Sequence, residues 1–263
     1  MKISEKNEFL KFRGTVSFAE LASANIVGYT TTDTAKGAQQ LAGASFVSVG
    51  AEALDIQDIV PQGDNAEGGT WIKWWDPVAK KYSANVYYVY EMYDPETDAT
   101  LPNSQGWADA DWYPIEKTFA PGEGFWFQSA NDNVKLVVSG QIDQPTTQYL
   151  SLPLTKGAQR MVQNPFPTDL DIQDIVLDGD NAEGGSWIKW WDPVAKKYGA
   201  NVYYVYEMYD PETDATLPNS QGWADADWYP IEKTFSVGDG FWVQSANDGV
   251  DISFPNPFYT PAN

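Results

Sequence analysis

The chain has 263 residues, of which 43% are hydrophobic and 15% aromatic, enough for packed cores and too apolar for an intrinsically disordered protein. Its 37 acidic and 16 basic side chains give a net charge of −21, which argues against nucleic acid and anionic membranes as partners. The absence of cysteine and histidine excludes disulfides, Ser-His-Asp relays and the usual zinc sites, and no apolar run is long enough for a membrane span.

The N-terminal region contains the first strand-like pattern. Leu10–Val16 (LKFRGTV) has apolar residues two apart and a glycine at its fifth place, and Leu136–Ile142 (LVVSGQI) repeats this pattern. Such alternation is typical of a half-buried strand, so we expect a similar strand to open each half of the chain. Met1–Glu8 is polar and has no signal core, which fits a cytoplasmic protein or one whose signal has been removed.

The following elements also read as strands. Trp71–Trp75 (WIKWW), Val86–Tyr93 (VYYVYEMY) and Phe125–Gln128 (FWFQ) are rich in aromatic and β-branched residues, which suit a pleated sheet and fit a helix poorly. Turn formers separate these strands, among them Asp-Pro at 76–77 and Pro-Gly-Glu-Gly at 121–124. Short strands with turns between them predict an all-β fold of the antiparallel sandwich or barrel type.

A long internal repeat divides the chain. Leu54–Val134 recurs almost unchanged as Leu170–Val250, and Tyr29–Phe46 aligns more weakly with Tyr149–Phe166. A repeat of this length is a complete folding unit used twice. We therefore expect two tandem homologous domains, each an antiparallel β-sandwich or barrel-like unit, over residues 1–133 and 134–263.

The tryptophans are candidate binding residues, because all twelve lie inside the two copies at matching places. In Trp71–Trp75, strand alternation puts Trp71, Lys73 and Trp75 on one face, and Lys73 marks this face as the wetter one. Exposed rings stack on sugars or anchor protein interfaces, whereas buried rings fill cores, and all three roles remain open. The candidates for a glycan site or an interface are Trp71, Trp75, Trp107, Trp112, Trp187, Trp191, Trp223 and Trp228.

Acidic loops offer a second kind of site. The stretch DGDNAEGG at 178–185 alternates the oxygen ligands that calcium prefers, and QGDNAEGG at 62–69 keeps most of them. Neither stretch has the frame of an EF-hand, and a capped, solvated turn is the alternative. Calcium is the one cofactor to consider, with the ligands Asp64, Asn65, Glu67, Asp178, Asp180, Asn181 and Glu183.

The order of short motifs resembles a known group of proteins. Asn25–Tyr29 (NIVGY) is followed by Leu54–Ile59 (LDIQDI), a Trp-Asp strand and Pro121–Trp126 (PGEGFW). This order is similar to the tandem β-rich domains of uncharacterised secreted bacterial surface proteins. The resemblance implies an exported, non-enzymatic protein located outside the cell or on its surface. The second unit departs from the pattern at 147–149 and 236–240.

Two functions follow as hypotheses. The first is a structural surface protein that assembles with copies of itself by β-strand addition, through an N-terminal strand carrying Phe9, Leu10, Phe12, Val16 and Phe18. The alternative is a carbohydrate-binding protein with two equivalent sites, assisted by calcium. Asp109 and Asp111, between Trp107 and Trp112, would suit a carboxylate glycosidase, but no further feature selects an acid and a nucleophile. We therefore expect no enzymatic activity.

Overall fold

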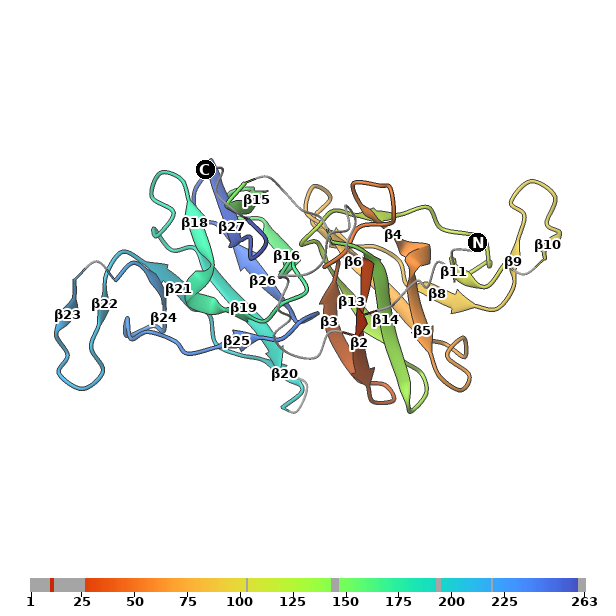
Figure 1. Cartoon of the computed structure of the whole chain (residues 1–263), viewed down its shortest axis with the longest axis horizontal. Coiled ribbons are helices and arrows are strands. Elements are labelled where there is room, and N and C mark those ends of the chain that lie inside the picture. Colours follow the sequence, from red (N-terminus) through yellow and green to blue (C-terminus); the bar gives the residue numbers. More distant parts are fainter. Residues whose placement is uncertain are drawn as a thin grey trace, which may run out of the picture.

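The computed structural model describes residues 27–102, 104–142, 147–192, 195–218 and 220–259, and the backbone of Leu10 and Lys11. Within these residues the fold is all-β, and its helical content is limited to two 3-10 turns, η1 (Ile56–Asp58) and η2 (Ile172–Asp174). Two similar units lie side by side along the long axis of the molecule (Figure 1). None of the helices in the described ranges has the length and apolar character needed to cross a membrane.

The first unit is a sandwich of two sheets. The small sheet has the order β1-β2-β14-β5, and the large sheet has the order β11-β8-β6-β13-β3, with β7 paired to β6. Two short pairs, β9 with β10 and β4 with β12, complete the unit. The strands are β1 (Leu10–Lys11), β2 (Val27–Thr34), β3 (Gln39–Gly43), β4 (Leu54–Asp55), β5 (Ile59–Gln62), β6 (Trp71–Asp76), β7 (Lys81–Tyr82), β8 (Val86–Val89), β9 (Met92–Tyr93), β10 (Thr100–Leu101), β11 (Gly106–Ala108), β12 (Thr118–Phe119), β13 (Gly124–Gln128) and β14 (Val134–Gln141).

The second unit repeats this sandwich. Its small sheet has the order β15-β27-β18, and its large sheet has the order β16-β26-β19-β21-β24, with β20 paired to β19. The pairs β22 with β23 and β17 with β25 match those of the first unit. The strands are β15 (Tyr149–Leu154), β16 (Gln159–Gln163), β17 (Leu170–Asp171), β18 (Val176–Asp178), β19 (Trp187–Asp192), β20 (Lys197–Tyr198), β21 (Val202–Val205), β22 (Met208–Tyr209), β23 (Thr216–Leu217), β24 (Gly222–Ala224), β25 (Thr234–Phe235), β26 (Gly240–Gln244) and β27 (Val250–Pro255).

Each core lies between the two sheets of its own unit. In the first unit, Ile72 and Phe127 of the large sheet pack with Leu136 and Val138 of β14 in one buried cluster. The predicted alternation of the WIKWW strand is confirmed, because Ile72 faces this core while Trp71 belongs to a different cluster on the opposite side of the sheet. The second unit buries the matching side chains in a cluster of its own.

The strand at 134–141 belongs to the first unit. β14 pairs along its whole length with β2 and also with β5, and β27 holds the same place between β15 and β18. The predicted domain boundary between residues 133 and 134 therefore separates β14 from the rest of its sheet. Strand pairing places the boundary between the units after Gln141. Of the residues predicted for an assembly strand, Leu10 lies in β1, which pairs in parallel with β2. The others, Phe9, Phe12, Val16 and Phe18, lie outside the described residues.

A glutamine side chain connects η1 to the large sheet of the first unit. Gln57 accepts a hydrogen bond from the amide of Trp107 at 2.8 Å through Oε1. Its Nε2 atom donates to the carbonyl oxygens of Trp107 at 3.0 Å and Ile115 at 3.1 Å. Gln173 makes the same three contacts in the second unit. Each glutamine thus supplies an acceptor for the tryptophan N–H and connects the strand β11 or β24 to the isoleucine that follows it.

The two units meet through the outer faces of their large sheets. The Trp75 ring lies edge-to-face on Trp242 with centroids 5.6 Å apart, and Trp191 lies in the same way on Trp126 at 5.7 Å. Trp75 matches Trp191 in the repeat, and Trp126 matches Trp242, so a pseudo-twofold axis relates the two contacts. The same patch of each unit is used on both sides, as in the interface of a symmetric dimer.

Candidate functional site

Four of the predicted binding tryptophans lie between the units. Trp71 and Trp187 are only 8% and 9% exposed, and Trp75 and Trp191 are half-buried beside them. The inference that Lys73 makes this face wet was wrong, because its ammonium lies 5.0 Å from the ring centroid of Trp71 within the interface. These rings form an interface inside one chain, so they are poorly placed to receive a glycan.

Trp107 and Trp223 lie inside the cores. Both are fully buried, and the Nε1 atom of Trp107 donates to the carbonyl oxygen of Ile59 at 2.6 Å. Trp223 makes the matching bond to Ile175 at 2.8 Å. A ring without accessible surface and with its polar atom satisfied has a structural role.

Trp112 and Trp228 are the two predicted tryptophans at the outer ends of the molecule. Trp228 is 43% exposed and stacks on Tyr209, with centroids 6.0 Å apart and an interplanar angle of 17°. Trp112 stacks in the same way on Tyr93, at 5.9 Å and 16°. We call each stacked pair, together with the exposed tyrosine next to it, a distal platform. The exposed tyrosines are Tyr90 and Tyr206.

The β9–β10 and β22–β23 pairs lie at opposite ends of the long axis (Figure 1), and Tyr93 of β9 and Tyr209 of β22 therefore put one distal platform at each end. Tyr90 and Tyr206 were not predicted as site residues. The alternation of side chains in Val86–Tyr93 does not reveal that β8 ends at Val89. That break turns Tyr90 outward, where it is 56% exposed. The only signal in the sequence was the excess of aromatic residues in this stretch.

A strained backbone holds each platform tryptophan. Trp112 has a φ of 68° and Trp228 a φ of 70°, in the left-handed region that bulky residues rarely adopt. Asp109 stabilises this turn, because its Oδ1 atom accepts from the amides of Asp111 and Tyr113, both at 2.9 Å. Asp109 therefore caps a turn, and Asp225 caps the matching turn of the second unit by accepting from the amides of Asp227 and Tyr229. Strain of this kind is concentrated at functional sites in proteins.

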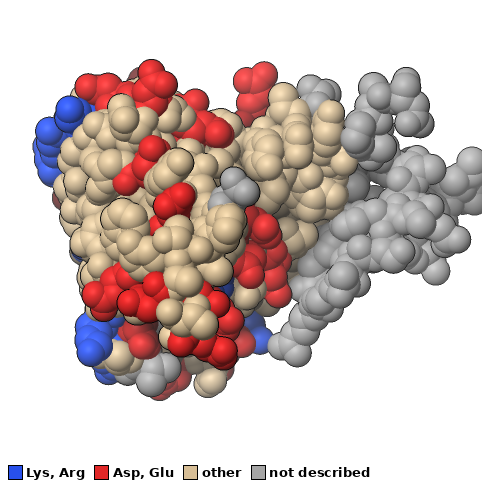
Figure 2. All heavy atoms as spheres, turned by 90° about the vertical axis from the view of Figure 1, so that its left-hand side faces the viewer, with Lys and Arg blue, Asp and Glu red and all other residues tan. Residues whose placement is uncertain are grey.

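The residue after each platform tryptophan is a tyrosine that hydrogen-bonds to an aspartate. The Tyr113 hydroxyl donates to Asp98 at 3.1 Å, and Tyr229 makes the matching bond to Asp214 at 3.0 Å. The hydrogen bond to Asp98 raises the pKa of Tyr113. Acidic side chains are scattered over the end of the second unit, with few basic ones among them (Figure 2). Each platform thus combines flat rings with hydroxyl and carboxylate groups.

The predicted calcium loops are tight turns. Asn65 and Asn181 have left-handed φ values of 54° and 56°, and their carbonyl oxygens accept hydrogen bonds from Asn131 and Asn247. Asp178 accepts from the Ser253 hydroxyl at 2.7 Å. Over the described part of the chain, no three carboxylates converge as a metal site requires. The structure therefore does not gather Asp64, Glu67, Asp180 and Glu183 into a calcium site.

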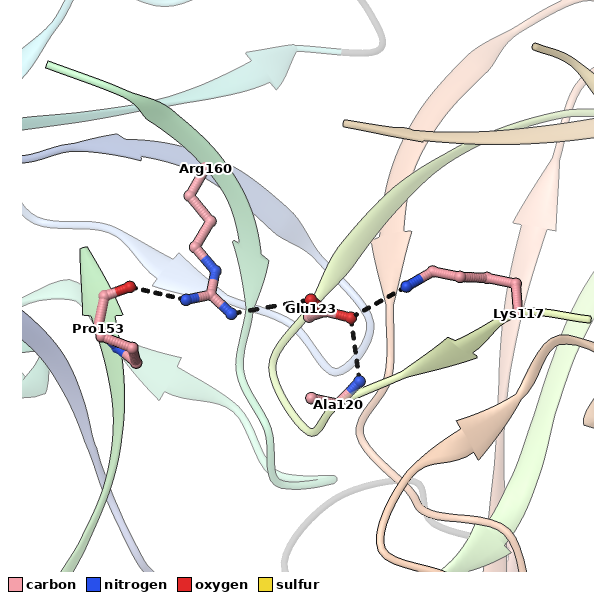
Figure 3. Close-up of polar contacts among 5 residues, drawn as sticks. All are labelled: Lys117, Ala120, Glu123, Pro153 and Arg160. Atoms are coloured by element: carbon pink, nitrogen blue, oxygen red, sulfur yellow. Dashed lines mark hydrogen bonds and ion pairs between the residues drawn. The ribbon is translucent and has the colours of Figure 1, made fainter. Parts of the chain in front are cut away.

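Two grooves lie along the junction, at positions related by the pseudo-twofold axis, and the first is filled. Arg160 of β16 reaches Glu123 of the first unit, with 3.8 Å between Nη2 and Oε1, and donates from Nη1 to the carbonyl oxygen of Pro153 at 2.8 Å (Figure 3). Glu123 also pairs with Lys117 at 3.5 Å and accepts from the amide of Ala120 at 3.0 Å. The remaining cavity measures about 20 Å³.

The second groove is open, with a volume of about 370 Å³. Gln40 stands where the repeat has Arg160, and Asp239 stands where it has Glu123, so both side chains are shorter. Gln40 carries no charge, and its Nε2 atom donates to the carbonyl oxygen of Asp33 at 3.0 Å. The ion pair that closes the first groove therefore has no counterpart. The lining is completed by Thr32, Trp190, Trp191, Lys233 and others.

Comparison of the chain with models of protein families, with curated proteins and with solved structures gave no match in any of the three.

Proposed function

We propose that this chain is a non-enzymatic, bivalent carbohydrate-binding protein that acts outside the cell or on its surface. The observation that carries the proposal is the presence of the same aromatic platform at both ends of one pseudo-symmetric body. Two sites built from matching residues at a fixed separation suit a ligand that repeats, such as a polysaccharide.

The chemistry of each platform favours a sugar. Trp228 presents an accessible flat ring, and its stacking on Tyr209 holds that ring in one orientation. The apolar face of a pyranose packs on such rings, while its hydroxyls require acceptors and donors at the edge. Asp214 and Tyr229 offer both kinds of group. The strained turn at Trp228 presets the ring, so little conformational entropy is lost on binding.

A glycan array with purified full-length protein tests the proposal. We expect retention on at least one polysaccharide, release of that glycan uncleaved, and loss of retention in the double variant Trp112→Ala/Trp228→Ala. Each single variant keeps one platform and loses avidity, by roughly 100-fold or more. Val78→Ala, at a residue 91% exposed outside the platforms, is the matched control. Absence of retention on every glycan would refute this function.

Self-assembly by strand addition is a second candidate, favoured by one difference between the small sheets. β1 pairs with the outer edge of β2, whereas the matching strand β15 is the edge of its sheet in the described part of the chain. An unpaired edge can accept a strand from a second copy. We expect deletion of residues 1–18 to abolish multimers seen by light scattering and electron microscopy. Multimers that persist after this deletion would exclude the N-terminal strand as the donor.

A further inference from the structure

We propose that the open groove between the units binds a small ligand through a guanidinium group, which takes the place that the Arg160 side chain fills in the matching groove. The pseudo-twofold axis supplies the template, because one copy of the site already holds a guanidinium. The proposal concerns a site separate from the distal platforms, and it stands or falls independently of carbohydrate binding.

The carboxylate for this ligand is Asp239. Solvent reaches it through the open groove, and it accepts a hydrogen bond from the amide of Ser236 at 3.1 Å. Its counterpart Glu123 accepts from the amide of Ala120 in the same way and binds Arg160 as well. Burial by the surrounding protein raises the pKa of Asp239, and the Ser236 amide and the Lys233 ammonium only partly oppose this effect. A bound cation would reverse that effect.

The walls of the groove suit a planar cation. Trp190 and Trp191 line it, and guanidinium groups stack on indole rings more readily than ammonium groups do. Lys233 does not exclude a second positive charge, because Lys117 holds the same place in the filled groove, where Glu123 binds both Lys117 and Arg160. The Lys233 ammonium also lies over the Phe235 ring, 5.1 Å from its centroid.

The first unit contributes a shorter, neutral side chain and extra space. Gln40 lines the groove and donates from Nε2 to the carbonyl oxygen of Asp33, so it places no charge in the groove where Arg160 fills the matching one. Thr32 replaces Leu152, so the groove also has a hydroxyl where its counterpart has an alkyl side chain. A volume of about 370 Å³ is sufficient for a small ligand.

Agmatine, which carries a guanidinium and no carboxylate, is the probe. Titration of the full-length protein by calorimetry and tryptophan fluorescence should give saturable binding of one agmatine per chain. Asp239→Asn should weaken binding at least about tenfold, since hydrogen bonds between charged groups are the strong ones. Gln40→Arg should abolish it by filling the groove from within. Gln62→Arg adds the same charge at an exposed position of β5 and should leave binding unchanged.

The reverse substitution gives the sharpest result. Arg160→Gln empties the filled groove and should raise the stoichiometry to two agmatines per chain, with circular dichroism to confirm folding. Binding that Gln40→Arg leaves intact would show only cations adsorbed on the acidic surface, and it would overturn the proposal, as would no binding at all. Equal binding of putrescine, a diamine, would overturn the assignment to guanidinium.

Discussion

Gly43 of the first unit lies against the side chain of Gln163, the residue at the same position of the second unit. A Cβ atom on Gly43 would lie 2.8 Å from Cγ of Gln163 and 2.4 Å from the carbonyl oxygen of Glu123. Equivalent residues that touch each other lie at the pseudo-twofold axis. Gln163 is fully buried there and donates to the Ser45 hydroxyl at 2.7 Å. The Gln163 side chain occupies the space that Gly43 leaves free at the axis. Two glutamines would overfill this space, and two glycines would leave it empty.

Gly43→Ala is therefore expected to destabilise the protein. The added methyl group meets backbone on one side, and overpacking of this kind costs about 1–3 kcal/mol. Urea unfolding followed by tryptophan fluorescence measures the effect. Gly199→Ala is the matched control, because the nearest atom to its Cβ would be 3.9 Å away. Equal unfolding midpoints for the two variants would contradict the assigned close approach.

Trp126→Ala and Trp242→Ala should cost similar amounts of stability, because each ring makes the same contacts across the pseudo-twofold axis. The rings are 4% and 3% exposed, so each truncation should lower the free energy of unfolding by about 3–5 kcal/mol. Trp228→Ala, at the exposed platform, should cost only about 1 kcal/mol. Chemical denaturation of the three variants is the measurement. A large cost at Trp228 with a small one at Trp126 would reverse the assignment of core and surface rings.

Gln57→Ala and Gln173→Ala should each destabilise their own unit. Removing the amide takes away the acceptor for the buried Trp107 N–H and the donor to the Ile115 carbonyl, whereas the Trp107 carbonyl keeps the Ile115 amide, and the loss should cost about 1–3 kcal/mol. Thermal unfolding of both variants checks this, with the exposed Gln62→Ala as control. If the glutamines only fill surface space, all three variants will melt with the parent protein.

Tyr198 should make stability fall at high pH. Burial raises its pKa from 10.0 to about 12, and its hydroxyl accepts from Nε1 of Trp242 at 2.8 Å. The folded state therefore keeps a proton that the unfolded state loses, so this contribution is full below pH 10 and is lost as the pH rises toward 12. Spectrophotometric titration should show a late tyrosinate that is missing in Tyr198→Phe. Titration of every tyrosine near pH 10 would disprove the burial of this hydroxyl.

Local patterns in the sequence predicted the strands well and their surroundings poorly. The alternation of Trp71–Trp75 assigned each ring to the correct face, because side-chain direction in a strand depends on neighbours in the chain. It could not reveal that a second sheet covers the outer face, since that depends on residues over a hundred positions away. Lys73 was misleading for the same reason, because its ammonium lies on a tryptophan ring inside the interface.

The candidate sites were predictable only in part. Trp112 and Trp228 were among the predicted residues, but Trp107 has the same local context and lies in the core. The open groove was not predicted, although the alignment already pairs Gln40 with Arg160. A difference between repeats becomes informative only when the structure shows that the two positions face equivalent carboxylates in the opposite unit.

The covalent link between the units has a consequence for how such a molecule can change. In a homodimer every substitution occurs twice, once on each side of the axis, so its two clefts must remain alike. Fusion of both units in one gene removes that constraint, and a mutation at Arg160 or at Gln40 alters one cleft while its twin keeps the interface closed. The duplicated chain can thus keep one groove filled as a contact between its units and adapt the other groove to a new partner.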